Sequence, residues 1–408
     1  MAKRFTWERG PFGKCPKCGR DTLGILSAGG HGVTLRCTEC RYSHSEGLPE
    51  VDKRVVYLDQ SIFSFLFQAK GGRRLPVGHE EFAGELYRRV RRGVLLQQVL
   101  FPHSDVHHDE TIVYHSANEL RAAYELIGGD ARLMDTRDVE RMQMWGYAQA
   151  YIEQREPALS FEVDQVLESN RNEWLPDMHI HVNANYDMFA DGIRENRAHS
   201  HEGMQRLVET WAAERPRFEQ LLDLELGAFF SRPQALLVAV QNVERASTSD
   251  DPMAFFEACH HHLLEEHRML SSAFINAGVP EANVGQEVLR FWNWDRNLEQ
   301  PHHRISAYMF AAIGRRVVNG QRRVNQGMMN DVRAIATYAP YVDAMFVDRE
   351  CAALLAESPL AQDLNYKAHI FSLTDGQAFL DYLAEIEAGT SPEVREQAAR
   401  IYGVRAHA

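Results

Sequence analysis

The chain has 408 residues, of which 45% are hydrophobic and 25% charged, so it is long enough for two or three folded units with a sizeable core. Its formal net charge of −13 argues against a protein that coats nucleic acid through bulk electrostatic attraction. No stretch of about 18 apolar residues occurs, and the opening sequence MAKRFTWERG lacks the apolar core of a signal peptide, so we expect a cytoplasmic protein without membrane association.

Four of the six cysteines lie in two closely spaced pairs near the beginning of the chain. Cys15 and Cys18 form one C-x-x-C pair, and Cys37 and Cys40 form the other. Each pair places two thiolates on one tight turn, and two facing turns complete a closed tetrahedral Zn²⁺ site, which stabilises a fold and leaves no open position for catalysis. We therefore predict a zinc ribbon over residues 1–48, with a redox dithiol as the alternative.

Short apolar runs on either side of a long central block predict the strands of an α/β domain. Residues 54–58 (RVVYL) are typical of a buried strand, and the pattern over 80–100 predicts a helix that leads into an extended segment. The strand signal returns at 344–347 and again at 368–371, before a helix over about 376–388.

The central block from about 105 to 318 is overwhelmingly helical in pattern. Amphipathic runs cover 116–127, 138–155 and 203–230, and prolines between such runs indicate several helices joined by short turns. Strands at both ends with helices between them indicate an α/β domain that is interrupted by a large helical insertion.

Two carboxylates follow the predicted strands directly. Asp59 comes after the strand at 54–58, and Asp348 comes after the strand at 344–347. The carboxyl ends of strands in an open α/β sheet are where ligands bind, and Mg²⁺ or Mn²⁺ prefers oxygen ligands and can activate a water for phosphodiester hydrolysis. The alternative for each residue taken alone is a helix N-cap.

Three motifs that contain these acids resemble those of PIN and PIN-like nucleases. The first is VVYLDQSIFS (55–64), an apolar strand with Asp59 at its end; the second is FPHSDVHHDET (101–111), a Ser-containing segment that enters a helix bearing Glu110. The third is NDVRAIATYAPYVDAMFVD (330–348), a helix that begins with Asp331, a turn with Asp343 and a strand that ends in Asp348.

The resemblance implies a PIN-like α/β fold: a parallel sheet flanked by helices over 52–112 and 326–390, with a helical insertion over 113–325. It also implies a Mg²⁺- or Mn²⁺-dependent endoribonuclease that hydrolyses RNA. The expected catalytic residues are four acids of these three motifs, namely Asp59, Glu110, Asp331 and Asp348. Asp343 is expected to join them as a metal ligand or, alternatively, to brace the final strand.

Several functional alternatives stay open. By analogy, a ribbon-bearing nuclease suits a toxin or antiviral defence effector, and the insertion is expected to shape an RNA channel or a homodimer or regulatory interface. A non-catalytic RNA- or protein-binding adaptor is the rival. A third alternative is a phosphohydrolase that uses Asp59 as a covalent nucleophile, but such enzymes would need a second Asp at the position of Ser61. Ser61 itself is expected either to hydrogen-bond a carboxylate or phosphate or to cap a helix.

Further signals are weaker. Two arginine runs either track phosphates or form solvated helix faces. Their members are Arg73, Arg74, Arg88, Arg89, Arg91 and Arg92, and Arg315, Arg316, Arg322 and Arg323. His107, three residues before Glu110, is interpreted as a surface histidine or one that supports the site, and the aromatic run at 291–294 as core rather than a base-stacking platform.

Overall fold

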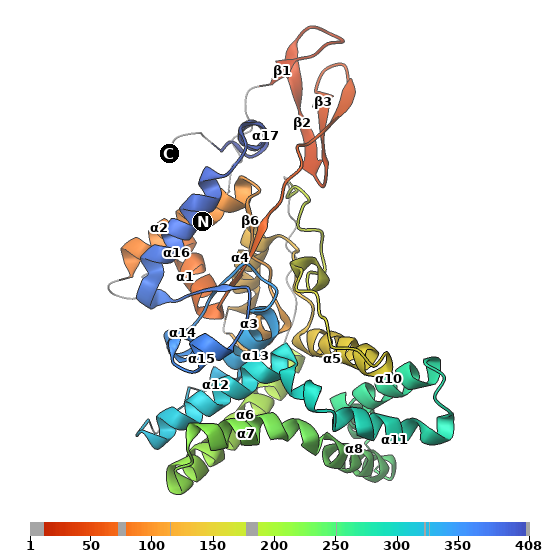
Figure 1. Cartoon of the computed structure of the whole chain (residues 1–408). Helices are drawn as coiled ribbons and strands as arrows, with labels where there is room; N and C mark the ends of the chain where they lie inside the picture. Colours follow the sequence, from red (N-terminus) through yellow and green to blue (C-terminus); the bar gives the residue numbers. More distant parts are fainter. Residues whose placement is uncertain are drawn as a thin grey trace.

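The computed structural model describes residues 12–71, 79–114, 116–176, 187–249, 251–321, 324–325 and 327–404. A β ribbon stands at one end of the molecule, a unit with a parallel sheet lies in the middle, and a helical part lies at the other end (Figure 1). In the described part of the chain, no helix combines the length and the apolar character that a bilayer crossing requires.

The ribbon is an antiparallel sheet with its strands in chain order. Its strands are β1 (Gly13–Lys14), β2 (Asp21–Gly29), β3 (Gly32–Cys37) and β4 (Ser43–Gly47). The part of the expected ribbon before residue 12 lies outside the described residues.

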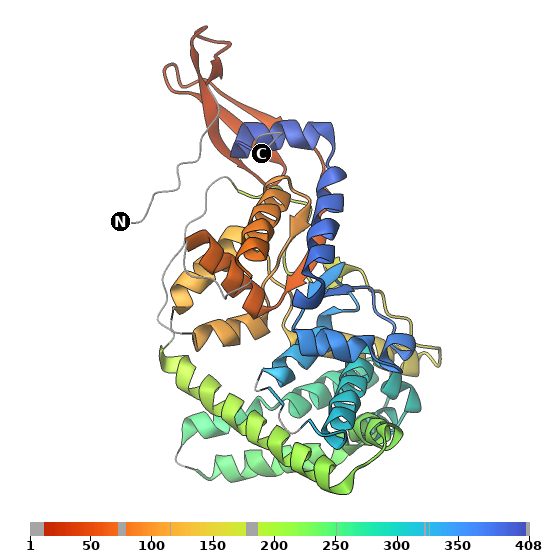
Figure 2. The same ribbon diagram turned by 90° about the vertical axis from the view of Figure 1, so that its left-hand side faces the viewer.

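The base of the ribbon packs on the rest of the chain through a small apolar cluster. Ala28 and Val33 meet Trp174 there, together with the C-terminal helix α17 (Pro392–Tyr402), which crosses the ribbon's base in Figure 2. Trp174 also exchanges two backbone hydrogen bonds with Gly30, of 2.7 and 3.0 Å. The ribbon is therefore held to the body by its lower end, and its cysteines lie toward the other end.

The central sheet is parallel throughout, with the strand order β6-β5-β7-β8. Its strands are β5 (Arg54–Leu58), β6 (Val99–Leu100), β7 (Ala344–Phe346) and β8 (His369–Phe371). The strands predicted at 54–58, 344–347 and 368–371 are confirmed as β5, β7 and β8. The fold is thus mixed α/β, with a small parallel sheet.

Helical layers cover both faces of this sheet. Val56 and Leu58 of β5 face one apolar cluster and Val55 and Tyr57 face another, as alternation along a strand requires. The first layer contains α1 (Gln60–Gly71), α2 (Glu80–Leu95), α4 (Ala117–Gly128) and α16 (Gly376–Ala388). The second contains α3 (Asp105–Ile112), α5 (Thr136–Ile152), α12 (Pro301–Val318), α13 (Met328–Tyr338), α14 (Arg349–Ala356) and α15 (Leu360–Asp363).

The remaining helices form the lower part of the molecule in both views (Figures 1 and 2). They are α6 (Asp187–Glu214), α7 (Phe218–Gly227), α8 (Arg232–Ser247), α9 (Pro252–Cys259), α10 (His262–Asn276) and α11 (Glu281–Trp292). Short 3-10 turns lie at η1 (Val163–Gln165), η2 (Ala228–Ser231), η3 (Asp295–Glu299) and η4 (Leu373–Asp375). Inside the range 113–325, which the sequence marks as an insertion, α4 and α12 pack on opposite sides of the sheet.

Two predicted helices end earlier than their patterns indicated. The helix predicted over 80–100 ends at Leu95, because Gln97 adopts a left-handed φ of 57° and lets the chain turn back into β6. The run over 203–230 is broken between α6 and α7, because Pro216 cannot continue a helix.

Candidate functional site

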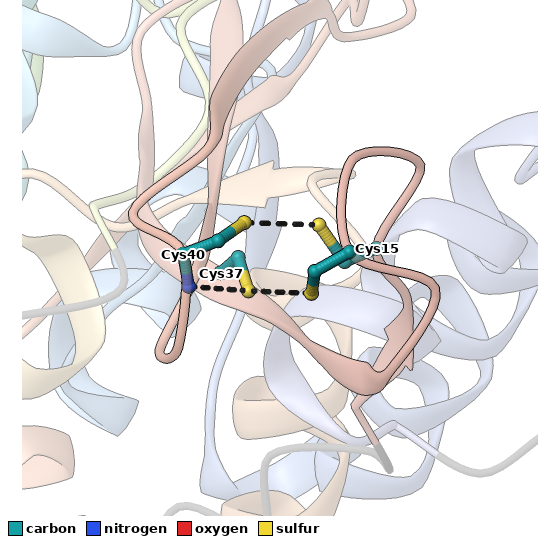
Figure 3. A group of neighbouring side chains, drawn as sticks. Cys15, Cys37 and Cys40 are labelled. Atoms are coloured by element: carbon teal, nitrogen blue, oxygen red, sulfur yellow. Dashed lines mark hydrogen bonds between the residues drawn. The ribbon is translucent and has the colours of Figure 1, made fainter.

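The four ribbon cysteines form a metal-binding cluster. Their sulfur atoms all lie within 4.8 Å of one another, with Cys15 to Cys40 at 3.6 Å and Cys18 to Cys37 at 3.7 Å. A zinc tetrahedron with Zn–S bonds of about 2.3 Å has sulfur atoms roughly 3.8 Å apart, whereas a disulfide holds them about 2.05 Å apart. Figure 3 shows Cys15, Cys37 and Cys40 pointing toward one another. The separations therefore fit a structural zinc ion.

Both cysteine turns have the same backbone design. The residue after each C-x-x-C pair adopts a left-handed conformation, with φ of 71° at Gly19 and 63° at Arg41. In the second turn the N–H of Cys40 donates to the sulfur of Cys37 at 3.4 Å. The Thr22 hydroxyl lies 3.1 Å from the same sulfur and lowers the pKa of Cys37 to about 6, which favours the thiolate that a metal requires.

A second candidate site lies where the connections of the parallel sheet diverge. The chain leaves β5 through α1 and α2 toward β6 on one side, and leaves β7 through α14 and α15 toward β8 on the other. The carboxyl ends of β5 and β7 therefore form a topological switch point, which is where open α/β sheets bind ligands. Asp59 and Asp348 follow these two strand ends.

Both strand-end aspartates cap a helix with one carboxylate oxygen. Asp59 Oδ1 accepts from the N–H of Ser61 at 2.7 Å at the start of α1, and Asp348 Oδ1 accepts from the N–H of Glu350 at 2.6 Å at the start of α14. The capping alternative is thus observed for both residues. The N-termini of α1 and α14, which carry partial positive charge, therefore both lie at the carboxyl ends of β5 and β7. Their partial charges favour negative charge at this position.

Asp331 and Glu110 join Asp59 from two further helices. Asp331 lies in the first turn of α13 and shares a hydrogen bond with Asp59, and Glu110 lies in α3. Burial, together with the charges of Asp59, Glu110 and Asp348, raises the pKa of Asp331 to about 9. Burial also raises the pKa of Asp59 and that of Glu110 above their ordinary values. The Asp59–Asp331 pair therefore holds a proton at neutral pH.

A small cavity lies among three of these carboxylates. Asp59, Glu110 and Asp331 line it together with apolar side chains such as Val106 and Ile335, and its volume is about 10 Å³. That space accommodates one water-sized occupant. In the described part of the chain, the four cysteines are the only group of three or more potential ligands whose atoms all lie within 4.8 Å of one another, so no three of the carboxylates lie that close together.

Asp343 lies at the opposite end of the sheet. Its Oδ2 accepts from the N–H of Val55 at 2.8 Å, and its Oδ1 lies 3.3 Å from both Arg54 and Lys367. Val55 and Asp59 are four residues apart on an extended strand, which separates the two ends by about 13 Å. Asp343 is therefore too far from Asp59 to share a cation with it, contrary to the expectation that it is a metal ligand. It braces the start of β7 instead, which was the alternative prediction from the sequence.

His107 is buried beneath this site and is not at the surface. Its Nε2–H donates to the carbonyl of Leu58 at 2.7 Å, while its Nδ1 accepts from the N–H of Ser104 at 3.1 Å. Burial lowers its pKa to about 3, so the ring stays neutral in this fixed tautomer. His107 thus attaches α3 to the strand end that precedes Asp59, and Glu110 follows one turn later. The triad of Ser, His and strand carbonyl was not recognised in the sequence, although the S-x-x-H spacing was visible.

Most described arginines of the two basic runs pair with glutamates. Arg88 and Arg89 bind Glu85, Arg92 binds Glu387, and Arg315 and Arg316 bind Glu357. Arg73, Arg74, Arg322 and Arg323 lie outside the described residues. The aromatic run at 291–294 contributes Phe291 and Trp292 to a buried cluster, which confirms the interpretation as core.

Two contacts of Glu110 were not foreseen. Asn330 Nδ2 donates to its Oε1 at 3.1 Å, and Arg197 Nη2 of α6 lies 3.3 Å from the same oxygen. No local pattern connects residues so far apart in the sequence, so only the fold could reveal them.

Comparison with protein-family models, with curated proteins and with solved structures finds no match to this chain. The resemblance to PIN-like nucleases therefore rests on the three sequence motifs alone.

Proposed function

We propose that this chain is a PIN-like, metal-dependent endoribonuclease that uses the carboxylates at the switch point. The observation that carries the proposal is the convergence of Asp59 and Asp348 from two strand ends with Glu110 and Asp331 from two helices, at one end of the parallel sheet. Three of them have raised pKa values, so the protein concentrates acidic groups where burial opposes their ionisation.

The donor set fits a hard divalent cation. All four groups offer carboxylate oxygens, which Mg²⁺ and Mn²⁺ prefer, and the small cavity among three of them has room for one small ion. Capping uses Oδ1 of Asp59 and of Asp348, so Oδ2 of each is the oxygen that we expect to bind the cation. We expect the loosely spaced carboxylates to draw together on binding, because a cation offsets their mutual repulsion.

The reaction adds water across one P–O bond of the RNA backbone. The water oxygen ends on phosphorus, one of its protons ends on the leaving ribose oxygen, and the other goes to solvent. A bound Mg²⁺ or Mn²⁺ would supply a water of lowered pKa and offset charge on the phosphate oxygens. Asp59, Glu110, Asp331 and Asp348 would hold that cation and orient its water toward the phosphorus.

The ribbon is proposed to contribute recognition rather than chemistry, because four thiolates close the coordination of a zinc ion. A role as a toxin or antiviral defence effector, acting with a homodimeric or regulatory partner, is a further part of the proposal and rests on analogy.

The test is cleavage of labelled single-stranded RNA, with DNA of the same sequence alongside. Zinc-loaded protein is dialysed free of Mg²⁺ and Mn²⁺, and Mn²⁺ is then added back, because EDTA would also extract zinc from the cysteines. Wild type is compared with Asp59→Asn, and with Asp381→Asn, which changes an exposed carboxylate on α16, as the matched control.

We expect RNA cleavage that depends on added Mn²⁺, is at least about 100-fold slower in Asp59→Asn, and is unchanged in Asp381→Asn. RNA that is bound but not cut would support the adaptor instead. Equal cleavage by Asp59→Asn and wild type would reject the proposed site.

A further inference from the structure

Helix α6 brings an arginine from the helical part into the acidic site. The positions of α6 that face the protein recur every three or four residues, as an amphipathic helix requires. The central line of this face comprises Ala190, Ile193, Arg197, His201, Met204, Val208 and Trp211, and Gly203 and Gln205 at its margin are also half-buried. Five of the seven are apolar, and the two polar ones stand together in the middle of the stripe.

The polar interruption coincides with the crossing of α6 over α3. Met204, Val208 and Trp211 join the apolar cluster beneath the sheet, whereas Arg197 meets Glu110 on α3. A leucine at position 197 would continue the apolar stripe, and a charged residue there gains nothing from packing. Arg197 therefore interrupts the apolar stripe at the point where α6 contacts Glu110, a carboxylate of the site.

The guanidinium of Arg197 has unused hydrogen-bonding capacity. Its Nη2 is 3.3 Å from Glu110 Oε1, but this buried atom makes no hydrogen bond within the described residues, and neither does the buried Nδ1 of His201 one turn later. A buried donor without a partner is costly unless a ligand satisfies it. A guanidinium presents paired N–H groups whose geometry matches a phosphate.

We propose that Arg197 binds the scissile phosphate of the RNA and is a catalytic residue of this site, an inference that rests on the proposed ribonuclease function. In the free protein Arg197 pairs with Glu110. When RNA binds, the guanidinium donates to a non-bridging phosphate oxygen and stabilises the charge that grows there during attack by water. Glu110 is then free to turn toward the cation. The helical part thus completes the active site and is not merely attached to it.

The experiment measures single-turnover RNA cleavage and Mn²⁺ binding on the same samples of zinc-loaded protein. Arg197→Ala is compared with Arg197→Lys and with Arg194→Ala, which removes an exposed arginine one turn earlier on α6 that pairs only with the exposed Asp191 among the described residues. Guanidinium chloride at low millimolar concentration is added to each, because it can occupy the space that Arg197→Ala leaves.

We expect Arg197→Ala to cleave about 100-fold more slowly, with Mn²⁺ affinity unchanged or higher because Glu110 is released from its partner. Arg197→Lys should retain part of the rate, added guanidinium should restore part of the Arg197→Ala rate, and Arg194→Ala should match wild type. A purely structural ion pair would show no guanidinium rescue of the cleavage rate.

Three results would overturn this inference while the proposed function stands: Arg197→Ala cleaves like wild type, its loss of rate merely follows a loss of Mn²⁺ binding, or added guanidinium restores none of the lost rate. If wild type itself fails to cleave RNA with Mn²⁺, the proposed function and this inference fail together.

Discussion

Replacing Asp331 with asparagine is expected to stabilise the cation-free protein, by an amount that grows as the pH rises above about 4. The cause is the carboxyl's raised pKa, about 9 in the folded protein against an ordinary value of 3.8. Because the folded state retains the proton and the unfolded state loses it, the free energy of unfolding falls as pH rises from about 4 toward 9. Below pH 4 the carboxyl is protonated in both states and the penalty vanishes.

The size of the effect follows from the proton balance. Each pH unit within this window corresponds to about 1.4 kcal/mol for one proton, so the interval from pH 5 to pH 8 corresponds to at most about 4 kcal/mol. Asp331 shares its proton with Asp59, which distributes the effect over both groups, and we expect about 2 kcal/mol for Asp331→Asn. The asparagine amide can still donate to Asp59.

The measurement is urea unfolding of wild type and Asp331→Asn at pH 5 and pH 8, with zinc retained and without Mg²⁺ or Mn²⁺. The advantage of the variant over wild type in unfolding free energy should be larger at pH 8 than at pH 5, by about 2 kcal/mol. Added Mn²⁺ should then stabilise wild type at pH 8 but not the variant. A variant that is less stable than wild type at pH 8, or whose gain is the same at both pH values, would refute the reasoning.

Three further predictions concern the remaining structure. Asp343→Ala leaves the N–H of Val55 without its partner and should lower unfolding free energy by about 2 kcal/mol, while Mn²⁺ titration shows unchanged binding because the residue lies at the other end of the sheet. Cys37→Ser should reduce zinc in native mass spectrometry from one ion per chain to none; a retained equimolar ion would contradict the four-thiolate site. In Gly128→Ala the new Cβ would lie 2.3 Å from the backbone oxygen of Phe101, and a loss of about 2–3 kcal/mol in urea unfolding is expected; unaltered stability would show that the chain shifts freely there.

Local patterns predicted the elements that frame the acidic site, for a physical reason. A strand segment buried on both faces must be apolar at every position, so VVYL of β5 and AMF of β7 could be identified without knowledge of their neighbours. The same holds for the cysteine turns, because two C-x-x-C pairs carry their own geometry. Strand β6 was hidden, because two residues are too few to show a period and they follow a helical pattern directly.

The sequence alone determined that an acid would stand at the end of each of two strands, and that four thiolates would gather near the start of the chain. Both results depend on residues within a few positions of one another. Only the tertiary structure decided that Asp343 braces the opposite end of the sheet and that Arg197 reaches Glu110. These outcomes depend on strand register and on the path of a distant helix, which are set by packing across the whole chain and leave no local pattern.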